Sequence, residues 1–359
     1  MDRERFTGCF TALATPMKEV ESLSHLTPIV DYRGLGKLVE FQNRYGTKGI
    51  LFVGTTGESP TLSWEEHITV IEEGSLLNKK CSIAGVGSNN TEETIMSMNQ
   101  LHGSPAKIDS ILLVDPYYNG PDSLQIREEY IRPVAERFPN YQVIPYIIPG
   151  RTGTKLSSED LAILHHELKN VNIVKEATGD LENMKLTRRL CEDEFDIISG
   201  DDDLTLKMIL DPEIRAQGVI SVASNVVPKA VSEMCNYALN GQQEKAIELE
   251  NALKPLLQLV TVKTEEEVIY EKKSFGKRTI KARNPVPYKT LMNILGMPAG
   301  PCRRPLGRMT QAGLNKVLEA ARTVLKNNPE ILEPVGEFFD VDLNKRLYDE
   351  QYSQGLIYE

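Results

Sequence analysis

The sequence predicts an α/β protein, a (β/α)8 TIM barrel followed by a C-terminal helical region. Short apolar runs alternate with segments of helical periodicity, which indicates a parallel sheet. Eight such runs over about 230 residues match the number of strands and the usual size of a closed barrel. The runs are Phe6–Pro16, Gly49–Gly57, Cys81–Gly87, Ser110–Tyr118, Tyr141–Pro149, Val171–Gly179, Phe195–Asp202 and Gly218–Asn225.

The segments between the runs carry helix start signals. Ser63 and Ser157 precede acidic residues as N-caps do, and Thr91 precedes two glutamates. A doubly wound open sheet is the alternative fold, but Gly85-Val86-Gly87 lacks the third glycine and the acidic partner of a dinucleotide site. The barrel is therefore favoured.

After Pro228 the strand-helix rhythm stops, and proline-punctuated helices are expected. We divide the chain into a catalytic barrel, residues 1–228, a helical domain, 229–327, and an extension, 328–359. The extension is expected to pack on a surface or a neighbouring subunit, or to stay partly mobile. The expected helices are Val231–Leu239, Gln243–Leu257, Tyr288–Leu295 and Gln311–Lys326.

Composition and charge limit the classes of function. Among 359 residues, 40% are apolar and 26% are charged, as in ordinary globular proteins. The net charge of −10 argues against a nucleic-acid surface. The only cationic cluster, Lys272–Arg283, follows three glutamates and is interpreted as a solvated loop or hairpin, with a polyanion site as the alternative.

Nothing in the sequence indicates a membrane protein or a secreted one. No apolar run approaches about 18 residues, and no basic-then-apolar leader opens the chain. The five cysteines are scattered without C-x-x-C pairing, which suits a reducing cytoplasm and offers no zinc site. We expect a cytoplasmic protein without membrane or nucleic-acid partners.

Lys175 ends the apolar run that begins at Val171. A parallel strand is usually buried on both faces, and a buried ammonium tends to lose its proton. A neutral amine is a nucleophile that can form a Schiff base with a carbonyl compound. The alternative is a strand-end lysine that reaches water or pairs with Glu176.

Other reactive side chains stand where the predicted strands end, and strand ends converge at one mouth of a barrel. Hydroxyls, phenols, one arginine and one lysine are present there without histidine, which suits proton transfer around an imine rather than metal-assisted hydrolysis. The sets are Gly54–Ser59, Asp115–Asn119, Tyr146 with Gly150–Gly153, Lys175, Ser199–Asp201, and Ile220 with Ser221.

Each of these residues also has a structural explanation. Tyr146 could be a core aromatic, Thr55 and Thr56 turn residues, and Arg151 a surface ion-pair residue. Asp201–Asp203 could bind a divalent cation but is more typical of a helix start, so no metal site is predicted. The convergence of several strand ends favours a functional site.

Six motifs closely resemble the dihydrodipicolinate synthase family of the pyruvate-dependent class I aldolases. They stand in family order, and the resemblance spans residues 6–327. The motifs are Gly-Thr-Thr-Gly-Glu-Ser at 54–59, Pro-Tyr-Tyr-Asn at 116–119, Gly-Arg-Thr-Gly at 150–153, Lys-Glu-Ala-Thr-Gly at 175–179, Gly-Val-Ile-Ser-Val at 218–222 and Asn-Pro-Val-Pro at 284–287.

The resemblance implies a lyase of lysine and diaminopimelate biosynthesis that joins pyruvate to L-aspartate 4-semialdehyde. By position, Lys175 would form the Schiff base with pyruvate, and Tyr146 would relay protons. Thr55 would link Tyr146 to Tyr118, which in this family reaches into the neighbouring subunit's site. The resemblance therefore implies a homo-oligomer, a tetramer or a dimer.

Further residues follow from the same resemblance. Arg151 would grip the carboxylate of the semialdehyde, and Thr56 with the backbones near Gly200 and Ile220 would surround pyruvate. No cofactor is implied beyond the covalent imine. An allosteric site for L-lysine as inhibitor is implied at Ser59, Trp64, His67, Asn89, Glu93 and Tyr117, although His67 and Glu93 could equally be ordinary helix residues.

The chain departs from the family pattern in a few places. Ile147 stands where asparagine is frequent, and Pro60 where a smaller residue is usual. Extra length lies near Glu19–Pro28, between Thr261 and Arg283, and after Asn328. The core motifs are untouched, so the chemistry is expected to be intact, whereas subunit packing is left open.

Two alternatives to the synthase remain. One is another reaction on the same scaffold, that of an N-acetylneuraminate lyase or a 2-keto-3-deoxy sugar acid aldolase or dehydratase. Tyr117-Tyr118 and the Gly-Arg-Thr-Gly segment favour the synthase, because a short aldehyde acid needs a carboxylate clamp rather than a polyol pocket. The other is a binding protein or sensor, which would have no need of the proton relay.

Overall fold

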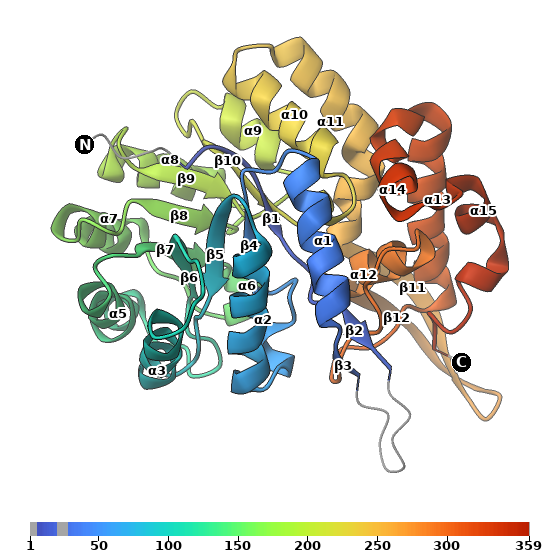
Figure 1. The fold of residues 1–359 in the computed structure, drawn as a ribbon, viewed down its shortest axis with the longest axis horizontal. Helices are drawn as coiled ribbons and strands as arrows, with labels where there is room; N and C mark the ends of the chain where they lie inside the picture. Colours follow the sequence, from blue (N-terminus) through green and yellow to red (C-terminus); the bar gives the residue numbers. More distant parts are fainter. Residues whose placement is uncertain (1–5, 20–27, 359) are drawn as a thin grey trace.

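Eight parallel strands close into a barrel, which confirms the predicted fold (Figure 1). The structure is a computed structural model that describes residues 6–19 and 28–358. The first strand pairs with both the second and the last strand of the barrel, so no edge is left open. The strands are β1 (Gly8–Ala12), β4 (Gly49–Phe52), β5 (Cys81–Gly85), β6 (Ser110–Val114), β7 (Gln142–Ile147), β8 (Ile173–Glu176), β9 (Asp196–Ser199) and β10 (Gly218–Ser221).

Helices follow the strands and surround the barrel (Figure 1). A π-helical turn, Arg127–Ile131, joins α4 to α5. A short pair of strands, β2 (Met17–Lys18) and β3 (Ile29–Val30), precedes the first helix. The surrounding helices are α1 (Tyr32–Arg44), α2 (Trp64–Leu77), α3 (Thr91–His102), α4 (Ser123–Ile126), α5 (Arg132–Arg137), α7 (Ser158–Glu167), α8 (Leu181–Cys191), α9 (Thr205–Leu210) and α10 (Pro228–Leu239).

The predicted helix starts are confirmed. The Ser63 hydroxyl accepts from the backbone N–H of Glu66, and the Glu66 side chain accepts from Ser63 N–H, forming a capping box. Ser157 caps α7 through Asp160 N–H. The third helix begins at Thr91 as expected, and Asn90 before it supplies the capping side chain.

The barrel interior is a packed core. Side chains two positions apart along a strand share a face, so alternate residues of each strand point inward. Phe6 and Phe10 stack near the amino-terminal end, with ring centroids 3.9 Å apart. The other buried side chains of this interior cluster are Ala12, Leu51, Ile83, Leu112, Ile144, Tyr146, Ile173, Ala177, Ile198 and Ile220.

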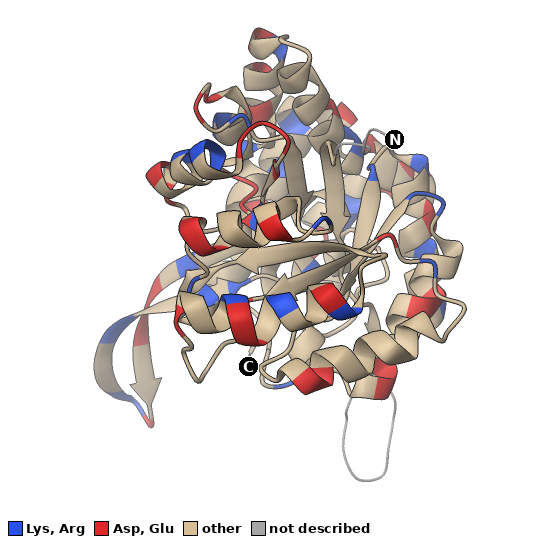
Figure 2. Ribbon diagram, turned by 90° about the vertical axis from the view of Figure 1, so that its left-hand side faces the viewer, with Lys and Arg blue, Asp and Glu red and all other residues tan. Residues whose placement is uncertain are grey.

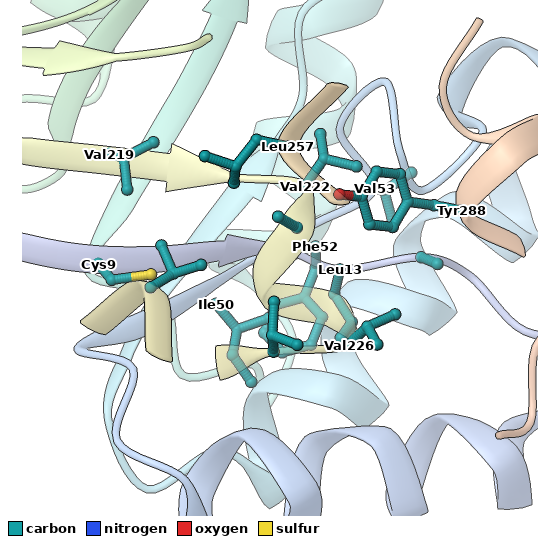
Figure 3. Close-up of a cluster of buried hydrophobic side chains, with 14 of the residues drawn as sticks. Cys9, Leu13, Ile50, Phe52, Val53, Val219, Val222, Val226, Leu257 and Tyr288 are labelled. Carbon is teal, nitrogen blue, oxygen red and sulfur yellow. The ribbon is translucent and has the colours of Figure 1, made fainter. Parts of the chain in front are cut away.

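The predicted C-terminal helices are present. The first of them begins at Pro228 as α10 and packs against β1. Tyr288 and Leu257 carry apolar contacts from the later helices to the barrel, where they lie beside Val53 and Val222 (Figure 3). None of the helices in the described part of the chain is long and apolar enough for a membrane span. The later helices are α11 (Gln243–Leu257), α12 (Val286–Ile294) and α13 (Gln311–Asn327).

The extension after Asn328 packs on the surface of its own chain. It contains α14 (Glu333–Phe339) and α15 (Leu343–Tyr348). The rings of Phe338 and Phe339 lie 5.3 and 5.2 Å from that of Phe41 on α1. Arg346 donates to the carbonyl of Ile294 at 2.6 Å. Of the three expectations for this segment, packing on a surface is the one observed.

The cationic cluster forms one strand of a long antiparallel hairpin, as one of its two interpretations predicted. The strands are β11 (Thr261–Tyr270) and β12 (Lys273–Arg283), and the hairpin projects from the body (Figure 1). Its tip exposes Ile269, Tyr270 and Phe275. The extra length expected near Glu19–Pro28 falls mostly on residues 20–27, which lie outside the described residues.

A buried ion pair fastens the C-terminal helices to the barrel. Lys289 on α12 lies 2.6 Å from the carboxylate of Glu58, and both side chains are almost completely buried. The same ammonium donates to the carbonyls of Thr15 and Pro301, while the second Glu58 oxygen accepts from Arg303 N–H at 2.8 Å. Every donor and acceptor of the pair is therefore used, which offsets the cost of desolvating two charges.

We predict that Lys289→Ala lowers the free energy of unfolding by about 3–5 kcal/mol, because it leaves the Glu58 carboxylate buried and uncompensated. Urea unfolding would measure the loss. Lys185→Ala is the matched control, since Lys185 pairs with Glu182 and Glu213 at the surface and should matter far less. Equal losses in the two variants would contradict the prediction.

Candidate active site

One cavity of about 970 Å³ opens at the carboxyl ends of the strands. Several sequence-predicted site residues line it together: Thr55, Thr56, Tyr146, Arg151, Lys175 and Gly200. Ile220 is fully buried in the interior cluster instead, two positions before Val222, which does line the cavity. The ends of β4, β7 and β8 thus deliver hydroxyl, phenol, guanidinium and amine groups to one space, and the ends of β9 and β10 complete its wall.

Lys175 points into the barrel because it stands two positions after Ile173, an interior residue of the same strand. Its backbone pairs with Tyr146 on β7, and its Nζ lies 4.1 Å from the centroid of the Tyr146 ring. Only 4% of the lysine surface is exposed. Gly200 leaves room for the chain, since a Cβ there would lie 3.2 Å from Lys175 Cε.

Burial lowers the pKa of Lys175 from 10.5 to about 8. Asp202 and Asp201 oppose this change because they favour the charged amine, whereas Arg151 adds to it. A substantial fraction of the amine is therefore neutral near physiological pH. A neutral amine inside a cavity is the state in which a lysine attacks a carbonyl carbon.

Tyr146 and Thr55 stand next to this amine. Burial raises the pKa of the Tyr146 phenol, and both Arg151 and a hydrogen bond with Thr55 oppose the rise. The phenol therefore stays protonated and can donate a proton to a reacting oxygen. Tyr146, Thr55 and Arg151 also line a second cavity of about 220 Å³, so they form part of the wall between the two cavities.

Arg151 lies on the short helix α6 (Pro149–Thr152), and the end of the hairpin holds it in place. Its Nη2 donates to the carbonyl of Asn284 at 3.0 Å, while Arg283 donates to the carbonyl of Gly150 at 3.2 Å. Burial and the nearby Arg283 lower the pKa of Arg151, and Tyr146 opposes them. The guanidinium keeps further donors for an anion.

Asn284 is a site residue that sequence reasoning gave no role. Its Nδ2 donates to the Thr56 hydroxyl at 2.9 Å, and its Oδ1 is buried without a hydrogen-bond partner within the described residues. The signal that could have found it was the Asn-Pro-Val-Pro segment, which formed part of the resemblance. An amide with an unused acceptor beside the cavity suits a bound hydroxyl or water.

The sequence did not predict the contacts that Asp202 makes or the environment of Asp201. Asp202 accepts from the Ser221 hydroxyl and from Val222 N–H, so it fixes the turn after β10. Asp202 does not cap α9, which has no side-chain cap, and the described segments contain no group of three or more His, Cys, Asp or Glu that could hold a metal ion. Burial raises the pKa of Asp201 to about 6.

Two more buried acids support the loops on either side of Tyr146. Asp115, after β6, accepts from Leu156 N–H at 3.0 Å, and burial raises its pKa to about 8. Glu176 accepts from Thr178 N–H at 2.8 Å, and burial raises its pKa to about 7. Both contacts are internal to the chain, which indicates a positioning role rather than contact with a ligand.

Tyr118 does not join Tyr146 and Thr55 within one chain. It is 93% exposed, and its backbone adopts a φ of 80°, which is uncommon for a residue with a side chain. Its neighbour Tyr117 turns inward and lines the second cavity. The phenol–hydroxyl–phenol chain inferred from the resemblance is therefore incomplete in the single chain.

The residues expected to bind lysine fall into separate groups. Ser59 and Tyr117 line the second cavity. Burial raises the pKa of the Tyr117 phenol, and the nearby Glu93 carboxylate raises it further. Glu93 accepts from the Ser88 hydroxyl at 2.6 Å. Asn89 is exposed. An acid and a phenol thus stand together near the catalytic residues.

Trp64 and His67 form the other group, with ring centroids 5.3 Å apart. Trp64 is 42% exposed, whereas His67 is buried with its Nε2 at 2.7 Å from the carbonyl of Gly85. Burial lowers the pKa of His67 to about 4, so the ring is neutral at physiological pH. The histidine holds α2 against the barrel, and only the tryptophan faces solvent.

Comparison with known proteins agrees with the family resemblance of the sequence motifs. Residues 5–324 match the model of the dihydrodipicolinate synthetase family. The chain is 37% identical over 316 residues to the 4-hydroxy-tetrahydrodipicolinate synthase of Methanocaldococcus jannaschii, an alignment that covers 88% of this chain and 96% of that one.

Solved structures agree in fold and in sequence. The dihydrodipicolinate synthase of Aquifex aeolicus is 35% identical, with a TM-score of 0.76 over 91% of this chain and 100% of that chain. The enzyme of Cyanidioschyzon merolae, solved with lysine bound, is 30% identical, with a TM-score of 0.76 over 89% of this chain and 98% of that chain.

We predict that the reactivity of the Lys175 amine rises with pH and levels off above about 8, because its folded pKa lies near 8 rather than 10.5. As the pH falls below about 8, a growing fraction of the amine is protonated and unreactive. The measurement is the rate of labelling by an amine reagent at each pH, followed by mass spectrometry of the Lys175 peptide. An exposed lysine, Lys207, is the internal control. The same profile for both lysines would contradict the assignment.

Proposed function

The chain belongs to the dihydrodipicolinate synthetase family, and we propose that it condenses pyruvate with L-aspartate 4-semialdehyde to form 4-hydroxy-tetrahydrodipicolinate. This lyase reaction belongs to lysine and diaminopimelate biosynthesis. The observation that carries the proposal is the Lys175 amine, which is buried, has a lowered pKa and lines a cavity open to solvent.

Lys175 Nζ attacks the keto carbon of pyruvate, and loss of water leaves an imine. The imine withdraws electrons, so a methyl proton leaves and an enamine forms. The enamine carbon attacks the aldehyde carbon of the semialdehyde, and the aldehyde oxygen takes up a proton. The amino group of the second substrate then attacks the imine carbon and displaces Lys175, which regains its free amine. The covalent imine serves as the electron acceptor, a function that an organic cofactor supplies in other enzymes.

Each of these steps moves a proton, and Tyr146 is the group placed to move it. Its protonated phenol lies against the Lys175 amine and is hydrogen-bonded to Thr55. We assign the third member of the relay to Tyr118 of a neighbouring subunit, because the chain's own Tyr118 is exposed. The active enzyme would then be a homo-oligomer, a dimer or a tetramer.

Arg151 is the group we assign to the carboxylate of L-aspartate 4-semialdehyde. Its guanidinium lines the same cavity as Lys175, and a carboxylate can accept two of its N–H groups at once. Thr56 and the backbones of Gly200 and Ile220 would hold the pyruvate part. This carboxylate clamp favours the synthase over a lyase for sialic acid or keto-deoxy sugar acids, whose substrates need a polyol pocket.

The proposal places the reaction in the cytoplasm, with feedback by L-lysine as an allosteric inhibitor. Glu93 and Tyr117 could hold the ammonium of lysine, and Ser59 stands at the same cavity. Asn89, Trp64 and His67 complete the set inferred from the family resemblance. Tyr117 lies next to Tyr118 in the chain, and its cavity shares Tyr146, so binding there could alter the relay.

We predict that borohydride added with pyruvate increases the mass of Lys175 by one reduced pyruvate, because reduction traps the imine. Lys175→Ala should abolish the increase, and Lys207→Ala, an exposed lysine, should leave it unchanged. Tyr146→Phe should lower kcat at least about 100-fold. Trapping on a lysine other than Lys175 would overturn the assignment.

The choice within the superfamily needs the second substrate. Steady-state rates with L-aspartate 4-semialdehyde should exceed cleavage of N-acetylneuraminate and of 2-keto-3-deoxy sugar acids by orders of magnitude. If the imine is trapped but the semialdehyde is not consumed, the scaffold serves another aldolase reaction.

We predict that millimolar L-lysine lowers the initial rate and that Glu93→Gln weakens this inhibition, because the variant removes the charge facing the ammonium. Glu92→Gln is the matched control, since Glu92 is exposed one position earlier on the same helix. Initial rates that do not change at millimolar lysine would reject feedback at this site.

A further inference from the structure

The base of the β11–β12 hairpin presents an uncompensated group of cations. Lys263 and Lys281 are directly opposite each other in the antiparallel register, and Thr261 and Arg283 form the next pair on the same face. Like charges directly opposite on neighbouring strands destabilise a sheet. A pair of lysines at this position therefore needs an explanation other than strand stability.

These side chains face the Lys175 cavity. Lys263, Lys281 and Arg283 all line it, together with Arg151 near its floor and Lys316 on α13. Lys316 Nζ donates to the carbonyl of Lys263 at 2.6 Å, which fastens the hairpin base to the helix. The outer part of the cavity is thus walled by a segment of extra length relative to the family pattern.

No acid in the described parts of the chain forms an ion pair with this group. The ion pairs of residues 6–19 and 28–358 do not include Lys263, Lys281 or Arg283. Glu265, the next acid outward on the same face, is hydrogen-bonded to Thr279 instead. The acids that line the cavity are Asp201, Asp203 and Glu319.

The cationic stretch is confined to the hairpin base. Farther out the charges mix, since Glu266 faces Arg278 and Glu267 faces Lys277 across the strands. Figure 2 shows both signs of charge on the projecting hairpin. Solvation of the hairpin does not explain why its only opposed lysine pair lies on the wall of the Lys175 cavity.

We propose that Lys263, Lys281 and Arg283 form an anion-binding vestibule that receives carboxylate substrates on their way to Lys175. The proposal rests on the function proposed above, in which both substrates carry a carboxylate. The vestibule raises the local concentration of these anions at a protein whose net charge of −10 repels them at long range. Two opposed ammonium groups and a guanidinium also fit a dicarboxylate better than a single carboxylate.

The test is the salt dependence of KM for pyruvate in the double variant Lys263→Glu/Lys281→Glu. Wild-type KM should rise as NaCl increases from about 0.01 to about 0.5 M, because salt screens exposed charges. At low salt the variant should show a KM about tenfold higher, with kcat unchanged and the salt dependence lost. Succinate, a dicarboxylate without a keto group, should compete with pyruvate in the wild type and lose most of this inhibition in the variant.

The matched control is Lys272→Glu/Lys273→Glu at the hairpin tip, which makes the same change in net charge away from the cavity. Its KM and salt dependence should equal those of the wild type. Equal effects in the two double variants, or a loss of kcat in the vestibule variant, would overturn the proposal. Lys263→Arg/Lys281→Arg keeps the charges and should restore the wild-type KM.

Borohydride trapping separates this proposal from the proposed function. At saturating pyruvate the vestibule variant should still trap the imine on Lys175. Absence of trapping in the wild type would contradict the proposed function itself. Normal trapping with an unchanged KM in the vestibule variant would contradict the vestibule alone.

Discussion

The chemistry proposed for this protein depends on keeping one amine out of water. The inward-facing residue that precedes Lys175 on its strand is apolar, and the Nζ of Lys175 lies over the Tyr146 ring. Burial moves the pKa of the amine down, while Asp201 and Asp202 hold it from falling further. With a pKa of about 8 the amine is mostly charged at physiological pH, while a minority is neutral and able to attack a carbonyl. A lysine at the same strand end but exposed to solvent would be protonated and inert.

The loops around the amine are held by buried polar contacts that span the chain. Glu58 and Lys289 tie the loop after β4 to α12, and Asn284 ties the same loop to the end of the hairpin. Asp202 fixes the turn after β10, and Asp115 fixes the segment that follows Arg151. Each contact satisfies groups that would otherwise be buried and unpaired, so the loops have little freedom to shift. Rigid loops are what allow Thr55, Tyr146 and Arg151 to keep their positions around a small substrate.

The C-terminal region contributes to the site as well as to the core. The hairpin and α13 wall the outer cavity, and Arg283 supports the loop that carries Arg151. The extension after Asn328 covers α1 and the end of α12 through Phe338, Phe339 and Arg346. The barrel carries Lys175 and Tyr146, and these added segments form the outer wall of the cavity around them. Tyr118 is exposed to solvent, and the proposed relay therefore takes this phenol from a second copy of the chain.

The sequence alone predicted the eight strands and placed Lys175 near the end of one of them. Parallel strands buried on both faces read as short apolar runs, and the residues that end them must meet at one mouth. It also predicted helices between the strands and after Pro228, and a hairpin as one of two forms of the cationic cluster, because capping residues and charge are local signals. The tertiary structure decided the partners that are distant in the chain. Glu58 and Lys289 are 231 residues apart, and Asn284 and Thr56 are 228 apart, so no local pattern could pair them. The tertiary structure also places Lys263 and Lys281 at the cavity. Strand register determines that the two residues are opposite each other, whereas packing of the hairpin against α13 and the barrel determines what their side chains face.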